Sequence, residues 1–196
     1  YFLLREIPYS GDGVFTPEGY LARINYDLAN DFGNLLNRTI SMTNKYFGGE
    51  LHKPTKEYFE FDKTLKAKIL DTVAGYTEDM DQLKVSNALS KVWSLISRTN
   101  KYIDETCPWI LAKDEEKKEE LNSVLYHLVE SLRHIGIMLS PVLLDASKEL
   151  FVQLNLDNSL QTWDSLSFGQ IETLKVIEKP TPIFPRLDLK KEQEYL

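Results

Sequence analysis

Residues 16–49 read TPEGYLARINYDLANDFGNLLNRTISMTNKYFGG, a pattern that indicates one long amphipathic helix. Thr16 is a suitable N-cap and Pro17 suits the first helical position, because a helix begins with backbone N–H groups that lack partners. Apolar side chains recur at intervals of three and four: Leu21, Ile24, Leu28, Phe32 and Leu35. Gly48 and Gly49 favour a stop near Phe47, because glycine readily leaves helical geometry. We therefore expect an all-helical fold that starts from this helix.

The same spacing predicts four further helices. They are expected at residues 61–77, from 84 to the break at Cys107, from within 113–120 to beyond 135, and at 141–156. After residue 156 the pattern weakens, and the prolines at 180, 182 and 185 fit neither a helix nor a central strand. We expect a five-helix bundle over residues 16–156, an N-terminal lead-in segment at residues 1–15, and an extended tail at residues 157–196 packed on the bundle.

Composition excludes several classes of protein. The 196 residues are 42% hydrophobic and 27% charged, which is typical of one globular domain. Lys and Arg number 23 against 30 for Asp and Glu, so the net charge is -7 and a broad electrostatic grip on nucleic acid is excluded. The single cysteine, Cys107, cannot close an internal disulfide and fits a reducing cytoplasm. No apolar run approaches the length that spans a bilayer.

The sequence lacks the usual signatures of catalysis. It contains no phosphate-binding loop, no dinucleotide fingerprint and no nucleophile elbow. His127 and His134 share a helix face, but no recurrent carboxylate pattern accompanies them, so we interpret both as structural or surface residues rather than metal ligands. Cys107 has no identifiable base beside it and is interpreted as an inert thiol. We therefore expect no catalytic residue and no metal site in this chain.

Two features remain as candidates for function. Asn34 and Arg38 are four residues apart and lie off the apolar stripe, so they form one polar edge, which is either a solvated face or a forked hydrogen-bonding site. Trp109 follows Pro108 at a helix end, where a loop would either present the ring for stacking on a planar ligand or fold it back on the bundle. Trp93 and Trp163 are expected to pack in the core.

Two of these segments resemble a known family. Residues 30–38, NDFGNLLNR, resemble the helix that opens the anticodon-binding domain of methionyl-tRNA synthetases, and residues 100–109, NKYIDETCPW, resemble the second anticodon element of that family. Residues 1–6, 11–15 and 184–188 match in the same order, so the resemblance spans essentially the whole chain. It is to bacterial members of the class I synthetases.

The resemblance implies a partner and a set of contacts. The partner would be the CAU anticodon loop of tRNA(Met), initiator and elongator, with no DNA and no membrane. Asn34 and Arg38 would contact anticodon bases, Trp109 would stack on one, and Pro108 would set the position of that ring. Asn100 and Asp104 would line the site. Two alternatives stay open: a relative specific for another amino acid, and a helical protein-interaction module that binds no RNA.

The catalytic part of the family is absent from this sequence. Members activate methionine with ATP through a His-Ile-Gly-His signature and a Lys-Met-Ser-Lys-Ser loop, and many also bind zinc, but neither signature is present here. The tetrapeptide at 134–137, His-Ile-Gly-Ile, falls inside a predicted helix and is not that signature. The chain starts at Tyr1 rather than Met, so we expect residues 1–15 to lead in from a missing catalytic domain. The chain alone would then be no enzyme and hold no cofactor, whereas the intact parent would be a methionine–tRNA ligase.

Overall fold

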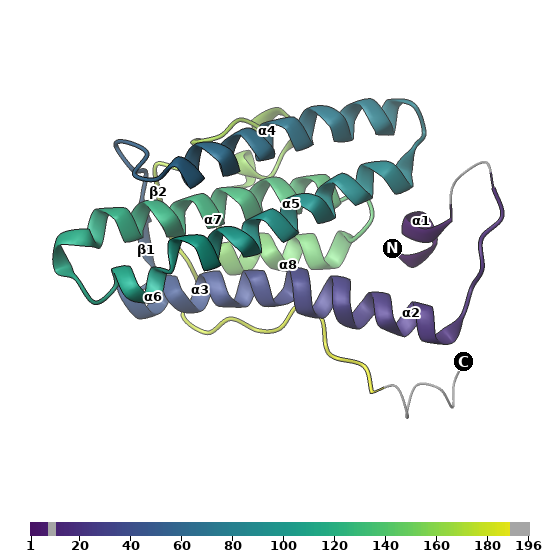
Figure 1. Ribbon diagram of the computed structural model, residues 1–196, viewed down its shortest axis with the longest axis horizontal. Helices are drawn as coiled ribbons and strands as arrows, with labels where there is room; N and C mark the ends of the chain where they lie inside the picture. The colour runs from purple at the N-terminus through teal and green to yellow at the C-terminus, as the bar shows by residue number, and fades with distance from the viewer. Residues whose placement is uncertain (8–10, 189–196) are drawn as a thin grey trace.

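The computed structural model describes residues 1–7 and 11–188 and shows a helical bundle (Figure 1). The longer helical elements are α2 (Pro17–Arg23), the π-helical stretch η1 (Ile24–Gly33), α3 (Asn34–Phe47), α4 (Glu60–Asp81), α5 (Val85–Thr106), α7 (Lys118–Leu139) and α8 (Leu144–Leu154). Short helical turns are α1 (Phe2–Glu6), α6 (Pro108–Leu111), η2 (Glu115–Lys117), η3 (Asn158–Leu160) and η4 (Trp163–Ser165). The predicted all-helical class is confirmed, with one small addition. Strands β1 (Glu50–His52) and β2 (Thr173–Lys175) form an antiparallel pair.

The first predicted helix corresponds to three consecutive elements, α2, η1 and α3. The Thr16 hydroxyl accepts a hydrogen bond from the backbone N–H of Gly19 at 3.1 Å, as expected of an N-cap. Gly48 and Gly49 end α3 with φ angles of 60° and 92°, which glycine adopts at little steric cost. The wider η1 stretch in the middle was not predicted, because the apolar spacing does not distinguish a π-helix from an α-helix over a few turns.

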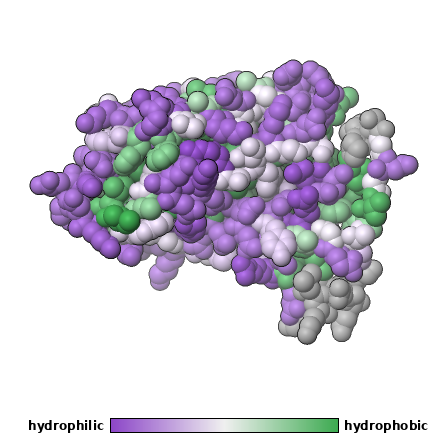
Figure 2. All heavy atoms as spheres, viewed as in Figure 1, coloured by the Kyte–Doolittle hydropathy of each residue, from purple (hydrophilic) through white to green (hydrophobic). Residues whose placement is uncertain are grey.

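Helix α7 runs through the middle of the bundle (Figure 1). Each of its residues from 121 to 139 is buried, because α3, α4, α5 and α8 all pack around it. Polar and charged side chains on α7 are therefore enclosed as well, Glu130, Arg133 and His134 among them. The face of the molecule that Figure 2 shows is mostly hydrophilic, with separate apolar patches.

The tail is fastened to α7 by a buried ion pair. Arg133 and Glu130 are fully buried, and Nη2 of Arg133 lies 3.0 Å from Oε2 of Glu130. The guanidinium also donates to the carbonyl oxygens of Ser165 at 2.9 Å and Ser167 at 2.7 Å. Oε1 of Glu130 accepts from the backbone N–H of Gln170 at 3.1 Å. These bonds hold the connection that leads into β2, where Leu174 pairs with Leu51.

Further along, the tail docks on η1. The amide of Asn25 donates to the carbonyl of Leu187 at 3.0 Å and accepts from its N–H at 2.9 Å. The ring of Phe184 lies 6.0 Å from that of Phe32. Residues 8–10 of the predicted lead-in segment and 189–196 of the predicted tail lie outside the described residues.

The N-terminus of α4 depends on one buried carboxylate. Asp62 accepts hydrogen bonds from the N–H groups of Tyr58 at 2.9 Å and Phe59 at 3.2 Å, and from the hydroxyl of Tyr102 at 2.6 Å. Burial, and next the charge of Asp62, raises the pKa of Tyr102 well above its usual value. The carboxylate therefore joins α4 to α5 as well as capping α4.

We expect Asp62→Ala to lower the free energy of unfolding by about 1–3 kcal/mol, because it leaves a buried hydroxyl and backbone donors without a partner. Urea denaturation measures the change. Asp71→Ala, at an exposed position of the same helix, is the matched control and should change stability by less than about 0.5 kcal/mol. Equal effects from the two variants would contradict the capping role.

The tryptophan predictions are confirmed at one position and wrong at another. Trp93 is buried in the core. Trp163 is 43% exposed and lies against Tyr76 with ring centroids 5.7 Å apart. It sits in the short turn η4, and part of its ring is left to solvent.

Candidate nucleic-acid interface

The predicted polar edge on α3 is exposed. Asn34 and Arg38 face solvent, whereas Leu35 and Thr39, each next to one of them in the sequence, are buried. The 3.6-residue period explains this, because it turns every fourth residue onto the same face. The two side chains therefore stand one turn apart on an accessible surface.

The end of α5 lies beside this edge. The side chain of Asn100 donates to the carbonyl of Asp31 at 3.1 Å, which links α5 to the end of η1. Nη2 of Arg38 is 4.0 Å from Oδ1 of Asp104, and both side chains are exposed. Such a loose surface pair contributes little, so the guanidinium stays available for another acceptor. The structure thus brings together Asn100, Asp104 and the α3 edge.

Trp109 lies a few residues further along the chain. Cys107 ends α5 in the left-handed region with φ of 45°, and Pro108 then occupies the first position of α6. Trp109 was expected on a loop, but it lies on this single helical turn, because a proline favours the start of a helix. Pro108 is buried and anchors the turn, whereas Trp109 is 43% exposed. The ring is therefore presented to solvent rather than folded back.

No hydrogen bond or ion pair joins Trp109 to the α3 edge within the part of the chain that the structure describes. The sulfur of Cys107 donates to the carbonyl of Asp104 at 3.0 Å, which connects the α5 end to the turn that carries the ring. Partial burial, and next the carboxylate of Asp27, raises the pKa of Asp31, whose backbone carbonyl accepts from Asn100. Asn34, Arg38 and Asp104 are exposed polar side chains, and the ring of Trp109 is exposed on the turn that follows α5.

Two residues of the surroundings were missed by sequence reasoning. Nη2 of Arg186 donates to Oδ1 of Asn30 at 2.5 Å, so the tail meets the stretch that immediately precedes Asn34. Both residues belong to segments that match the family, which is the signal that could have paired them. Arg98 and Glu105 form a further pair at 2.8 Å that braces the last turns of α5.

The buried histidines have structural surroundings. Nδ1 of His127 lies 2.7 Å from the carbonyl of Ser123, and Nδ1 of His134 lies 2.8 Å from that of Glu130. Burial, reinforced by Arg133, lowers the pKa of His134 to about 3, so this ring is neutral at pH 7. Among the described residues no cluster of three or more His, Cys, Asp or Glu side chains could hold a metal ion. The described helices also include none that is long and apolar enough to cross a membrane.

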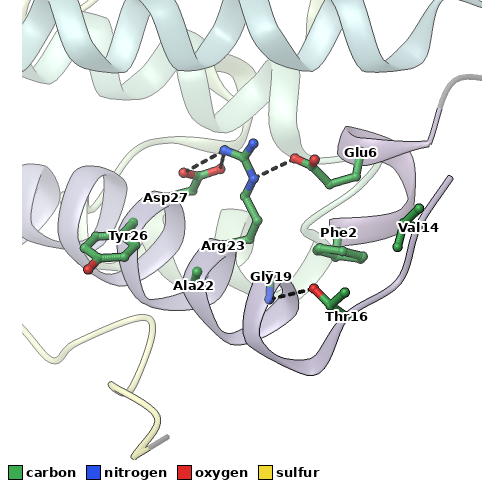
Figure 3. A pocket seen from close by; sticks show the side chains of 9 residues that line it. All are labelled: Phe2, Glu6, Val14, Thr16, Gly19, Ala22, Arg23, Tyr26 and Asp27. Atoms are coloured by element: carbon green, nitrogen blue, oxygen red, sulfur yellow. Dashed lines mark hydrogen bonds and ion pairs between the residues drawn. The ribbon is translucent and has the colours of Figure 1, made fainter.

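A separate pocket of about 360 Å³ lies between α1 and the first turns of α2 and η1 (Figure 3). Arg23 bridges Glu6 at 2.6 Å and Asp27 at 3.1 Å across its floor. The hydroxyl of Tyr1 donates to Asp27 at 2.6 Å. These contacts fix α1 to the bundle, and none of the six residues predicted to bind an anticodon lines this pocket.

A family profile described as the anticodon binding domain of methionyl tRNA ligase matches residues 54–195. The chain belongs to this family. A second profile, described as tRNA synthetases class I (M), matches residues 1–40. The candidate interface therefore draws on both matched regions, since Asn34 and Arg38 fall in the second and Trp109 in the first. The alternative of a helical protein-interaction module is not favoured.

Relatives and solved structures agree with this family. The chain is 54% identical over 198 residues to the methionine–tRNA ligase of Bacillus subtilis (strain 168). The match covers 100% of this chain but only 30% of that protein. It is 48% identical to the corresponding ligase of Halalkalibacterium halodurans, with the same shares covered. The apo methionyl-tRNA synthetase of Mycobacterium tuberculosis superposes with a TM-score of 0.89 at 28% identity, covering 96% of this chain and 38% of that one. The chain thus spans about a third of these proteins.

Proposed function

We propose that this chain reads the CAU anticodon of tRNA(Met), initiator and elongator, with Asn34 and Arg38 as base contacts and Trp109 as a stacking platform. Asn100 and Asp104 line the site, and Pro108 holds the turn that carries the ring. The observation that supports this most is the meeting of two separate motif segments. Asn100 reaches the carbonyl of Asp31 at 3.1 Å, and Arg38 faces Asp104 at 4.0 Å.

The hydrogen-bonding capacity of Arg38 suits the first anticodon base. Cytosine offers acceptors at N3 and O2, whereas uracil carries a donor at N3. An arginine side chain only donates, so it satisfies cytosine and meets a donor in uracil. Leaving such a donor unpaired costs about 1–3 kcal/mol, which is enough for useful discrimination.

The acidic character of the chain is compatible with this reading. A net charge of -7 disfavours a wide contact with the phosphate backbone. Single-stranded loops are read instead through stacking and the edges of splayed bases, which needs only a few side chains. A small polar edge with one exposed ring meets that requirement.

We further propose that the parent protein is a cytoplasmic ligase that attaches methionine to tRNA with ATP. One M. tuberculosis methionyl-tRNA synthetase, similar to this chain with a TM-score of 0.88, is bound by methionyl-adenylate. ATP, and also zinc, would be held by the part of the parent that lies outside this chain. In this proposal residues 1–15 lead in from that part, residues 16–156 form the anticodon-binding bundle, and residues 157–196 brace it. The chain alone binds RNA without catalysing aminoacylation.

We expect Trp109→Ala to weaken binding of a CAU anticodon stem-loop by about 1–3 kcal/mol, because one base loses its stacking partner. Binding is measured by fluorescence anisotropy of a labelled stem-loop, with circular dichroism to confirm the fold. Trp163→Ala is a matched control, since both rings are 43% exposed and only Trp109 belongs to the proposed site. Wild-type affinity in Trp109→Ala, or the same loss in both variants, would contradict the proposed platform.

A further inference from the structure

A second pocket, of about 300 Å³, opens on another part of the bundle. Its walls come from the loop before α4, from α4 and α7, and from the tail, and they include Lys53, Lys56, Glu57, Lys66, His127 and Phe168. None of the six residues proposed to bind the anticodon lines it. Its volume is at the lower end of the range for small-molecule sites, which suits a ligand no larger than a mononucleotide.

The pocket gathers positive charge on a chain that is acidic overall. Three lysines, Lys53, Lys56 and Lys66, line it with one acidic residue, Glu57, and Nζ of Lys53 also lies 2.8 Å from Oε1 of Glu172. Nζ of Lys66 lies 3.2 Å from Glu57 and 5.3 Å from the centre of the Phe168 ring. Such exposed pairs are weak, so a ligand that carries more negative charge than one carboxylate can replace them. Lysine binds phosphate as a compact point charge.

His127 supplies the second, independent feature. The side chain is 1% exposed. Nδ1 lies 2.7 Å from the carbonyl of Ser123, which accepts only, so Nδ1 carries the proton and Nε2 is left as an acceptor. Nε2 is buried and has no hydrogen-bond partner among the described residues. A buried acceptor without a partner is unfavourable, and a ligand with an O–H or N–H group would satisfy it.

The ring of His127 is oriented by its neighbours. Nδ1 is bonded to the carbonyl of Ser123 on its own helix, which fixes that edge of the ring. The ring lies 5.1 Å from that of Phe168, which also lines the pocket. His127, Phe168 and the three lysines therefore line the same pocket.

We propose that this pocket binds a phosphorylated ligand of mononucleotide size. The phosphate lies among Lys53, Lys56 and Lys66, and a hydroxyl or amino group of the same ligand donates to Nε2 of His127. A ribonucleotide carries both groups, and it can be a free nucleotide or a residue of bound RNA. The proposal stands apart from anticodon reading, because the two sites share no residue.

Calorimetric titration of the 196-residue chain with adenosine 5′-monophosphate tests the proposal, with adenosine as the ligand that lacks the phosphate. We expect saturable binding of the monophosphate and much weaker binding of adenosine. Lys66→Met should weaken binding of the monophosphate by about tenfold, because one charge-assisted contact is lost. Lys63→Met is the matched control, because Lys63 lies on the same helix but does not line the pocket, and it should bind like the unmodified chain.

Two further readouts locate the ligand. In ¹⁵N spectra of the histidine rings, the monophosphate should shift the Nε2 signal of His127, whereas those of His52 and His134 stay in place. His127→Phe should weaken binding of the monophosphate, whereas Lys63→Met should not. Trp109→Ala should leave monophosphate binding unchanged, which separates failure of this proposal from failure of the anticodon proposal.

An RNA arm distinguishes the two sources of the phosphate. If RNA supplies the phosphate, Lys66→Met and His127→Phe weaken binding of intact tRNA, whereas Lys63→Met does not. The monophosphate then also competes with tRNA for the pocket. If a free nucleotide is the ligand, the monophosphate binds and these variants leave tRNA affinity unchanged. The proposal is overturned if binding of neither the monophosphate nor tRNA changes in Lys66→Met or His127→Phe. It is also overturned if monophosphate binding does not saturate below about 10 mM and both variants bind tRNA as tightly as the unmodified chain.

Discussion

Arg133→Ala is expected to lower the free energy of unfolding by about 3–5 kcal/mol, because removal of one partner of a buried ion pair leaves the other charge uncompensated. Glu130 would be left fully buried without the guanidinium that lies 3.0 Å from it. The carbonyl oxygens of Ser165 and Ser167 would lose their donors at the same time. Urea denaturation followed by circular dichroism measures the change.

Two comparisons make this result specific. Lys148→Ala, at an exposed position of α8, is the control for loss of a positive charge and should change stability by less than about 0.5 kcal/mol. The double variant Glu130→Gln/Arg133→Met removes both charges and should recover part of the loss, because no uncompensated charge remains. A loss below about 1 kcal/mol for Arg133→Ala would show that the pair does not fasten the tail.

Arg38→Ala is expected to weaken binding of a CAU stem-loop by about 1.5–3 kcal/mol, the range for a hydrogen bond that involves a charged group. It should also reduce discrimination between CAU and UAU stem-loops, because the side chain that rejects the uracil N3 donor is gone. Trp109→Ala should instead weaken both stem-loops alike, since stacking has little base preference. Fluorescence anisotropy titrations with the two stem-loops give the loss of affinity for CAU and the change in discrimination between CAU and UAU.

Lys101→Ala is the charge-matched control for Arg38→Ala. Lys101 is exposed near the end of α5 and pairs loosely with Glu105 at 3.8 Å. Loss of a general electrostatic attraction would affect both variants and both stem-loops equally, and that pattern would contradict a reading role for Arg38. A drop in affinity for CAU that is confined to Arg38→Ala supports it.

The helices could be predicted because their signals are local. The Thr16 cap, the Gly48-Gly49 stop and the apolar stripe between them each act within a few residues. The β1–β2 pair could not be predicted in this way, because three-residue strands carry little pattern and the partners Leu51 and Leu174 are far apart in the sequence. The burial of Arg133 and Glu130 could not be predicted either, since charged residues are expected at the surface unless a partner is known.

In the candidate site, too, local features could be predicted from the sequence, whereas contacts between helices could not. Exposure of Asn34 and Arg38 follows from helical period alone, and the structure agrees. The approach of Arg38 to Asp104 and of Asn100 to Asp31 depends on how α5 packs beside η1 and α3, which no local pattern encodes. Trp109 was predicted on a loop because the Cys107 break was recognised, but the short turn that begins at Pro108 was not.

Tryptophan emission in the presence of CAU and UAU stem-loops tests anticodon reading most directly. We expect saturable quenching by the CAU stem-loop, and a single C-to-U change should weaken binding by about 1–3 kcal/mol. Quenching should be lost in Trp109→Ala, which keeps Trp93 and Trp163. Equal titrations with both stem-loops, or unchanged quenching in Trp109→Ala, would contradict an anticodon reader built from Arg38 and Trp109.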